Sequence, residues 1–409
     1  MVNNIRFLHK GRSKGENIPP NSFGVKNAAK ARKFHESFPD YSATPLRELR
    51  ELSNYLGVNR IYIKDESCRF GLNAFKALGG TYCIGRYIAS QLEMDIEELS
   101  YQKLKSKAVK DHMGDITFVT ATDGNHGKGI AWAAKELGYK SVVYLPKGSA
   151  TERLNSIAEL GAEAYITDLN YDDTVRFAKA QAEKEDWVLL QDTAWEGYEE
   201  IPRWIMEGYT TLGHEITEQL KGREITHIFL QAGVGSMAGA LTGFFADYYG
   251  EKERPIITIV EPNKADCVFR TAGAKDGTLQ IVTGGMDTIM AGLACGEVCT
   301  LGWEILKNYG DNFVSVPDVI AAKGMRILGN PLTGDNKVIS GESGAVTLGF
   351  VSEVMKRGEL WDMKKKLGLD GGSKILCIST EGDTDRKNYR KIVWDGFYPS
   401  FSVEADNIN

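Results

Sequence analysis

The sequence has little of what marks several large classes of protein. No uncharged apolar run approaches the roughly 20 residues of a membrane-spanning helix, and residues 1–24 lack the apolar core of a signal peptide. An excess of positive charge is also absent, because the formal net charge is -6. This balance argues against nucleic acid or an anionic membrane as the main partner. We therefore expect a cytoplasmic protein that acts on a small molecule.

Paired cysteine motifs and clustered histidines are missing as well. Six cysteines are scattered without a C-x-x-C pair, and six histidines are equally dispersed, so we predict no metal site. Cys295 and Cys299 are spaced so that they could share a helix face, but buried free thiols are the preferred interpretation. The sequence does not decide whether Cys267, Cys295 or Cys299 form a disulfide.

The length and composition indicate a soluble protein of two domains. A chain of 409 residues is too long for one small core, and its 42% apolar and 25% charged residues are ordinary for a globular protein. Residues 1–40 are rich in Asn, Lys and Pro and are expected to be irregular. Residues 46–56 have the pattern of a helix that ends at Gly57, and the polar tail 403–409 is expected to fray.

Strand-like and helix-like segments alternate in the middle of the chain. The predicted strands are 116–122, 141–145, 164–167 and 187–190, and the helices between them are 130–137, 151–160 and 172–185. Further strands are expected at 60–64, 225–231, 256–260 and 374–378. Alternation of this kind predicts a parallel sheet with right-handed crossovers, and ligands bind at the carboxyl ends of such strands.

Acidic residues follow the first and the last strand of this alternating stretch. Asp123 begins the loop Asp-Gly-Asn-His-Gly, and Asp192 follows the strand that ends near residue 190. A turn closed by Asx hydrogen bonds would use the same residue types. Because a structural turn rarely needs Asp, Asn and His together, we favour a functional site at residues 123–127.

A glycine-rich loop after the strand 225–231 is typical of a phosphate site. Residues 233–239 read Gly-Val-Gly-Ser-Met-Ala-Gly and open a helix, so backbone N–H groups and the positive helix end would face an anion. Two alternatives are a close contact between helix and strand, and a dinucleotide site in which Glu261 binds a ribose.

A single lysine lies between an aromatic residue and small residues at the start of a predicted helix. Lys76 follows Phe75 and precedes Ala77 in a segment that runs to about Gln91. Burial and the nearby positive helix end both favour the neutral amine that forms a Schiff base.

Four motifs in this order resemble the fold-type II pyridoxal-phosphate enzymes, the group of tryptophan synthase β, threonine dehydratase and cysteine synthase. They are the F-K-x-x-G of residues 75–79, the T-x-G-N-H-G of residues 122–127, the glycine loop, and the S-T-x-G turn of residues 379–382. Residues 341–345 are similar to another segment near the cofactor of that group, and the resemblance covers about residues 40–390. It implies two three-layer αβα domains and a homodimer. The large domain is expected from residues 1–87 and 207–409, and a smaller inserted domain from residues 88–206.

The resemblance also implies a role for each matching residue. Lys76 would bind pyridoxal 5′-phosphate as a Schiff base, Asn125 would contact its ring oxygen, and Thr380 would hydrogen-bond its ring nitrogen. The backbone of five loop residues would hold the phosphate: Gly233, Val234, Gly235, Ser236 and Met237.

Residues 121–127 and 190–198 are similar to diaminopropionate ammonia-lyases within this group. This implies α,β-elimination of D- and L-2,3-diaminopropionate to pyruvate and ammonia. A carboxylate at position 123 would repel the carboxylate of a plain amino acid but suits a substrate with a second ammonium. Because Lys76 covers one cofactor face, Asp123 is our choice of base for the other enantiomer, and Asp192 would hold the substrate amino group.

Like charges on Asp123 and Asp192 would raise the pKa of at least one of them if the sheet brings the two strand ends together. Trp195 and Tyr198 are then expected to form a pocket wall. The alternative for Asp192 is that it only caps a helix after Thr193.

Three other functions remain open at this point. They are a serine/threonine dehydratase-like lyase, a nicotinamide-dependent oxidoreductase that uses residues 233–261, and a protein that binds the cofactor without catalysis.

Overall fold

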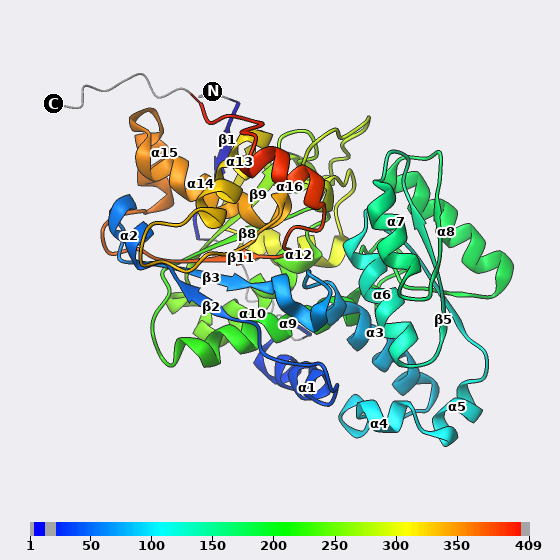
Figure 1. Cartoon of the computed structure of the whole chain (residues 1–409). Helices are drawn as coiled ribbons and strands as arrows, with labels where there is room; N and C mark the ends of the chain where they lie inside the picture. The colour runs from blue at the N-terminus through cyan, green and yellow to red at the C-terminus, as the bar shows by residue number, and fades with distance from the viewer. Residues whose placement is uncertain (1–3, 13–21, 402–409) are drawn as a thin grey trace.

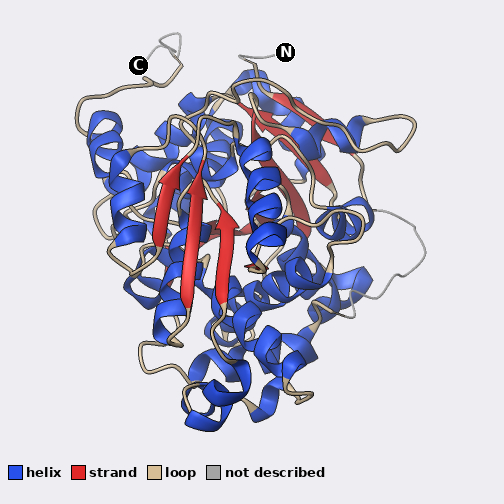
Figure 2. Ribbon diagram, turned by 90° about the vertical axis from the view of Figure 1, so that its right-hand side faces the viewer, coloured by secondary structure: helices blue, strands red, loops and turns tan. Residues whose placement is uncertain are grey.

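The computed structural model describes residues 4–12 and 22–401 and contains two sheets, each flanked by helices (Figures 1 and 2). We call the four-stranded sheet the small sheet and the seven-stranded sheet the large sheet. In Figure 1 the small sheet and its helices α6, α7 and α8 lie at the right, beside the body that holds the large sheet.

The small sheet has the parallel alternating architecture that the sequence predicts. Its order is β6-β5-β4-β7, and all neighbours are parallel. The strands are β4 (Thr117–Ala121), β5 (Lys140–Leu145), β6 (Glu163–Ile166) and β7 (Val188–Leu189). The crossover helices are α6 (Asn125–Glu136), α7 (Thr151–Ala158) and α8 (Tyr171–Glu185). Since β4 and β7 are adjacent and parallel, the loops that carry Asp123 and Asp192 leave the sheet at the same edge.

The large sheet has five parallel central strands and an antiparallel strand at each edge, in the order β1-β10-β9-β8-β11-β3-β2. The strands are β1 (Arg6–His9), β2 (Leu46–Glu48), β3 (Arg60–Asp65), β8 (His227–Gln231), β9 (Ile256–Pro262), β10 (Asn312–Val316) and β11 (Lys374–Ser379). The loops after β8 and β11 carry the glycine loop and Thr380, so the same rule on strand ends applies to both sheets.

Thirteen more α-helices occur among the described residues. They are α1 (Val25–Glu36), α2 (Arg50–Leu56), α3 (Ala77–Gln91), α4 (Tyr101–Leu104), α5 (Lys107–Met113), α9 (Glu200–Leu220), α10 (Ser236–Glu253), α11 (Cys267–Gly273), α12 (Thr300–Tyr309), α13 (Asp318–Gly329), α14 (Glu342–Lys356), α15 (Trp361–Leu367) and α16 (Arg386–Val393). Helix α3 packs on both α6 and α9, and Gly79 allows the second contact, because a Cβ there would lie 2.6 Å from the Tyr209 ring.

Two expectations about the N-terminal region are wrong. Residues 1–40 are not wholly irregular, because they contain β1 and α1, whose apolar stripe of Ala28, Ala31 and Phe34 is buried among polar neighbours. The helix expected at 46–56 begins only at Arg50, because residues 46–48 pair with β3 as an edge strand. Gly57 ends that helix with φ +71°, as predicted. The predicted frayed tail lies outside the described residues.

The two predicted domain boundaries fall inside α3 and α9, so both helices run through them. A continuous buried core extends from Phe118 in the small sheet to Leu230 in the large one. The division at residues 87/88 and 206/207 stays a prediction.

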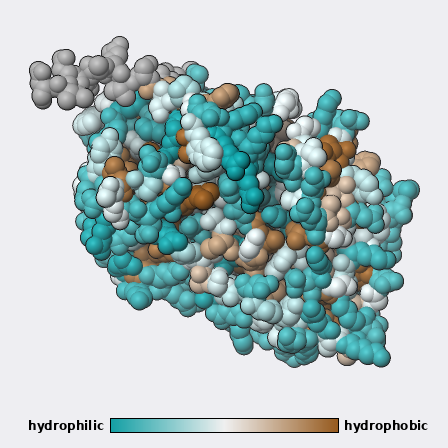
Figure 3. All heavy atoms as spheres, in the orientation of Figure 1, coloured by the Kyte–Doolittle hydropathy of each residue, from teal (hydrophilic) through white to brown (hydrophobic). Residues whose placement is uncertain are grey.

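None of the described helices is long and apolar enough to cross a membrane. All six cysteines are free, with Cys68 exposed and the other five buried. The surface seen in Figure 3 is largely hydrophilic, with small apolar patches between polar side chains.

Candidate active site

A buried cavity lies where the strand ends of the two sheets meet. It is lined by every residue that the sequence analysis assigned to the cofactor or to catalysis: Lys76, Asp123, Asn125, Asp192, Gly233, Val234, Gly235, Ser236, Met237 and Thr380. The remaining lining residues include Phe75, Tyr171, Gln231, Cys295, Ser343 and Glu381. Segments separated by more than 300 positions in the sequence therefore form one site.

Lys76 is held at the N-terminal end of α3 by backbone contacts on both sides. The Phe75 N–H donates to the carbonyl of Thr380 at 3.1 Å, which joins the lysine segment to the turn after β11. On the other side α6 approaches closely at Gly129, where a Cβ would lie 3.0 Å from the carbonyl carbon of Lys76. Only a residue without a side chain fits this contact, so Gly129 fixes the lysine backbone.

The ammonium of Lys76 donates to the carboxylate of Asp192. Burial alone would lower the pKa of Lys76, but Asp192, Tyr209 and Asp123 outweigh it and raise that pKa above its ordinary value. The expectation that the surroundings favour the neutral amine is therefore wrong for the net effect. The sequence could not reveal the partner of this lysine, because Asp192 is 116 positions away.

Asp192 is the more strongly ionised of the two predicted acids. Burial would raise its pKa, but His126 and Lys76 hold the pKa of Asp192 at about 2. The Nδ1 atom of His126 lies 3.8 Å from the carboxylate, and its Nε2 atom contacts the Leu190 carbonyl at 2.8 Å. No helix begins near Thr193, since α9 starts at Glu200, so the helix-capping alternative for Asp192 is wrong.

Asp123 lies in the same cavity, at the end of β4. Burial raises the pKa of Asp123, with Glu381 and Asp192 adding to the effect and Arg153 and Lys76 opposing it. The predicted upward shift is confirmed, although burial rather than like charge is its largest cause. The turn itself is closed by the Thr122 hydroxyl, which accepts from the N–H groups of Gly124 and Gly127. Within the described part of the chain, no donor hydrogen-bonds to the Asp123 carboxylate, which leaves it available to a substrate.

Asp123 also faces a second cavity, of about 440 Å³, which adjoins the first. Arg153 lines this cavity and donates from Nη1 to the backbone carbonyl of Asp123 at 3.0 Å. Tyr171 belongs to the walls of both cavities. Asp123 and Tyr171 therefore stand where the two spaces join.

The glycine loop has the geometry of a phosphate cradle. Gly235 has φ +95°, which a side chain would strain, and α10 begins at the next residue with its backbone N–H groups directed at the cavity end. A Cβ on Gly233 would lie 3.2 Å from the Leu293 backbone and 3.3 Å from the Cys295 sulfur. A side chain at position 233 would therefore crowd Leu293 and Cys295, which line the same cavity as the loop.

Neutral polar side chains of Gln231, Ser343 and Thr380 line the same cavity. The Gln231 amide donates to the Thr380 hydroxyl at 3.1 Å, so the proton of that hydroxyl is left for another acceptor such as a ring nitrogen. Gln231 Oε1 and Ser343 Oγ are buried without a partner among the described residues. Orphaned polar atoms, a phosphate cradle and a lysine in one cavity fit pyridoxal 5′-phosphate.

Glu381 is a residue of this site that sequence reasoning missed. It is buried and accepts from the Asn125 side-chain amide at 2.5 Å and from the Ser343 N–H at 3.2 Å. It thereby ties the small-sheet loop to the turn after β11 and fixes Asn125. Glu381 could have been identified from the sequence, because it lies between Thr380 and Gly382 inside the predicted S-T-x-G motif.

Two other sequence interpretations are wrong. Trp195 and Tyr198 stack on each other at 4.3 Å, and the Tyr198 hydroxyl donates to the Leu189 carbonyl, but neither residue lines the cavity. The carboxylate of Glu261 is buried and accepts from the N–H groups of Val268 and Phe269. Because this carboxylate is hydrogen-bonded to the start of α11, it is not free to bind a ribose beside the glycine loop.

Comparisons with known proteins agree with this site. Residues 38–381 match the family described as pyridoxal-phosphate dependent enzymes. The chain is 51% identical over 384 residues to diaminopropionate ammonia-lyase of Escherichia coli K12, which covers 93% of this chain and 94% of that protein. A structure of the E. coli enzyme with an aminoacrylate-PLP azomethine reaction intermediate superposes with a TM-score of 0.88 at 47% identity, covering 96% of this chain and 98% of the other. Threonine deaminase isoform 2 of Solanum lycopersicum, at 18% identity and a TM-score of 0.70 over 95% of this chain and 96% of its own, shares the fold. The chain therefore belongs to the diaminopropionate ammonia-lyase family of fold-type II pyridoxal-phosphate-dependent enzymes.

Proposed function

We propose that this chain is a carbon–nitrogen lyase that uses pyridoxal 5′-phosphate to eliminate ammonia from D- and L-2,3-diaminopropionate. The released aminoacrylate hydrolyses to pyruvate and a second ammonia. Membership of the family supports the reaction, and the extent of the identity to relatives that act on diaminopropionate supports the substrate.

One observation carries the choice of substrate: three carboxylates line the same cavity as Lys76. They belong to Asp123, Asp192 and Glu381. 2,3-Diaminopropionate brings two amino groups against one carboxylate, whereas serine and threonine bring one of each. A site rich in carboxylates stabilises the additional ammonium and disfavours a substrate with a single ammonium, whose own carboxylate the site repels.

When bound, pyridoxal 5′-phosphate supplies the electron sink that makes the substrate Cα–H acidic. The protein residues then have separate tasks. Lys76 binds the cofactor and accepts the α-proton at Nζ from one enantiomer. The backbone of residues 233–237 holds the phosphate, Thr380 hydrogen-bonds the ring nitrogen, and Asn125, fixed by Glu381, contacts the ring oxygen.

The two enantiomers present their α-protons to opposite cofactor faces, so one base cannot serve both. We assign the second base to the Asp123 carboxylate, whose raised pKa suits proton transfer better than the depressed pKa of Asp192. Asp192, which stays ionised, holds the substrate amino group.

We further propose that the enzyme is a cytoplasmic homodimer. Six free cysteines suit a reducing compartment. Trp394 is 72% exposed and Phe397 is 54% exposed, close together in the sequence, which suits contact with a second copy. Light scattering coupled to gel filtration tests this, and a monomer at micromolar concentration would contradict it.

The proposed reaction is tested by pyruvate release from serine, threonine and both diaminopropionate enantiomers, with the visible absorbance of the purified protein recorded beforehand. We expect visible absorbance from the bound cofactor and turnover of both diaminopropionate enantiomers well above that of the hydroxy amino acids. Faster turnover of serine or threonine would favour the dehydratase alternative. Absorbance without any turnover would favour a protein that only binds the cofactor.

A further inference from the structure

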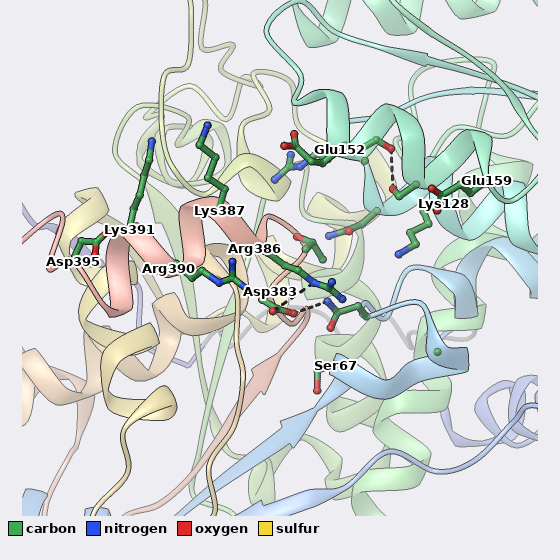
Figure 4. Close-up of a pocket in the computed structure, with 17 residues that line it drawn as sticks. Ser67, Lys128, Glu152, Glu159, Asp383, Arg386, Lys387, Arg390, Lys391 and Asp395 are labelled. Atoms are coloured by element: carbon green, nitrogen blue, oxygen red, sulfur yellow. Dashed lines mark hydrogen bonds and ion pairs between the residues drawn. The ribbon is translucent and has the colours of Figure 1, made fainter.

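Another cavity is larger than that of the active site. It has a volume of about 970 Å³ and lies between the small-sheet helices α6 and α7 and the large-sheet side, where the turn at residues 383–384 leads into α16 (Figure 4). It shares only Asn125 with the active-site cavity and only Arg153 with the cavity beside it. The reaction proposed above uses none of its charged residues.

Basic side chains outnumber acidic ones in its walls, although the chain as a whole has a net charge of -6. The basic residues are Lys128, Arg153, Arg386, Lys387, Arg390 and Lys391, and the acidic ones are Glu152, Glu159, Asp383 and Asp395. Helix α16 carries four of the cations, and all four are exposed, as expected of an ordinary solvated helix face. The charge count alone therefore does not indicate a ligand.

Lys128 distinguishes this cavity from a solvated surface. Its side chain is half-buried, and among the described residues no carboxylate forms an ion pair with it. Burial lowers the pKa of Lys128, and the like charge of Arg386 lowers it further, against a weaker opposing effect of Glu159. In Figure 4 the Lys128 and Arg386 side chains reach toward each other across the space between α6 and α16, whereas Lys387 and Lys391 point away.

Among the acidic residues of the cavity, one forms an ion pair with Arg386 and none forms an ion pair with Lys128. Asp383 accepts from the Asn73 amide at 3.2 Å and forms a long ion pair with Arg386, in which Oδ2 lies 3.9 Å from Nε. Glu152, Glu159 and Asp395 are exposed to solvent. Two cations from opposite walls thus face one space, and the only described ion pair between them and the acidic residues of the walls is the long, exposed one of Arg386 with Asp383.

We propose that this cavity is a binding site for a small organic polyanion, a molecule with at least two phosphate or carboxylate groups, held by Lys128 and Arg386. An anionic group between the two cations removes their mutual repulsion and forms charge-assisted hydrogen bonds with both. The volume lies at the upper end of the range for small-molecule sites, so a single phosphate leaves most of it unfilled. Arg390 lies in the same walls and offers a cation to a second anionic group, and Arg153, whose Nη1 already donates to the Asp123 carbonyl, lies in them as well.

Isothermal titration of the holoenzyme at low ionic strength tests the proposal, with pyrophosphate as the phosphate probe and citrate as the carboxylate probe. The bound cofactor occupies the glycine loop, so neither probe competes for it. Two charge-assisted contacts predict saturable binding with a Kd of about 1 mM or lower for at least one probe. Binding of one probe and not the other assigns the anionic group.

Lys128→Gln and Arg386→Gln should each raise that Kd at least about tenfold. Lys366→Gln, which removes the same charge from the exposed face of α15, should change it less than about twofold. Cofactor absorbance and diaminopropionate turnover in the same samples verify that the variants are folded, and neither depends on the anion. Absence of saturable binding of both probes to the wild type, or an unchanged Kd in both cavity variants, would overturn the proposal.

Discussion

Replacement of Asp123 by asparagine should separate the reactions of the two enantiomers. Asparagine keeps the shape of the side chain and removes its ability to accept a proton. Loss of a general base costs about 100- to 10,000-fold in rate, or about 3 to 5 kcal/mol of transition-state stabilisation. We expect that loss in kcat/KM for D-2,3-diaminopropionate alone.

The L-reaction should change less than about tenfold. The structure gives the reason, because the Asp123 carboxylate raises the pKa of Lys76. Its removal lowers that pKa and favours the neutral amine, which is the form that accepts a proton. The assay is pyruvate release from each enantiomer at saturating cofactor, with visible absorbance as the control for cofactor retention.

A pH profile of the wild-type D-reaction adds a second test of the same base. Asp123 must be ionised to accept a proton, and burial raises its pKa, so the D-rate should fall as the pH is lowered through that raised pKa. Equal losses on both enantiomers in the Asp123→Asn variant would refute the base assignment and leave Asp123 as a binding residue.

Four further substitutions test other parts of the site. Lys76→Ala should abolish both elimination and the visible absorbance of the bound cofactor, and near-normal turnover in a spectrophotometric assay would exclude Lys76 as the attachment point. Asp192→Asn should lower kcat/KM for both enantiomers by similar factors, about 10- to 100-fold for one lost charged hydrogen bond, whereas loss on only one enantiomer would argue against a shared binding role. Gly235→Asp places a strained, negatively charged residue where φ is +95°, so we expect cofactor affinity to fall at least about tenfold in a fluorescence titration while circular dichroism stays native. Glu342 has a pKa raised by burial to about 7 in the folded protein, so its protonation stabilises the fold below the unfolded pKa and this stability is lost as the pH rises toward 7. In urea titrations, the free energy of unfolding of the wild type should fall by up to about 3 kcal/mol more than that of Glu342→Gln between pH 5 and 8. Identical pH dependence of the two unfolding free energies would disprove the pKa shift.

The sequence was sufficient to predict the small sheet because each of its strands is marked at both ends. The β-branched run before Asp123 and the glycine and asparagine after it define β4 and the start of α6. Once the strands are parallel and β4 is adjacent to β7, the convergence of Asp123 and Asp192 follows from geometry. The order of the strands depends on tertiary contacts. The sequence therefore predicted an interaction of Asp123 with Asp192 only on the condition that the sheet brings their strand ends together.

What the sequence could not supply are the partners that side chains meet across the two sheets. The pKa of Lys76 is raised by Asp192, which lies in the loop after β7, and Asn125 is fixed by Glu381 from the turn after β11. Local reasoning also overestimated Trp195, which lies beside Asp192 in sequence but packs on Tyr198 outside the cavity. Helix α1 was not predicted because seven of its twelve residues are polar or charged, and its buried stripe is only a few residues wide.

The central claim is that the enzyme eliminates an amino group rather than a hydroxyl group from the β-carbon of its amino-acid substrate. The most direct measurement is the ratio of ammonia to pyruvate released by the purified holoenzyme when D- and L-2,3-diaminopropionate and serine compete in one mixture. The account predicts two ammonia molecules for each pyruvate, because diaminopropionate loses one amino group by elimination and the other by hydrolysis of aminoacrylate. A ratio of one ammonia per pyruvate would show that serine is the substrate consumed and would contradict the account.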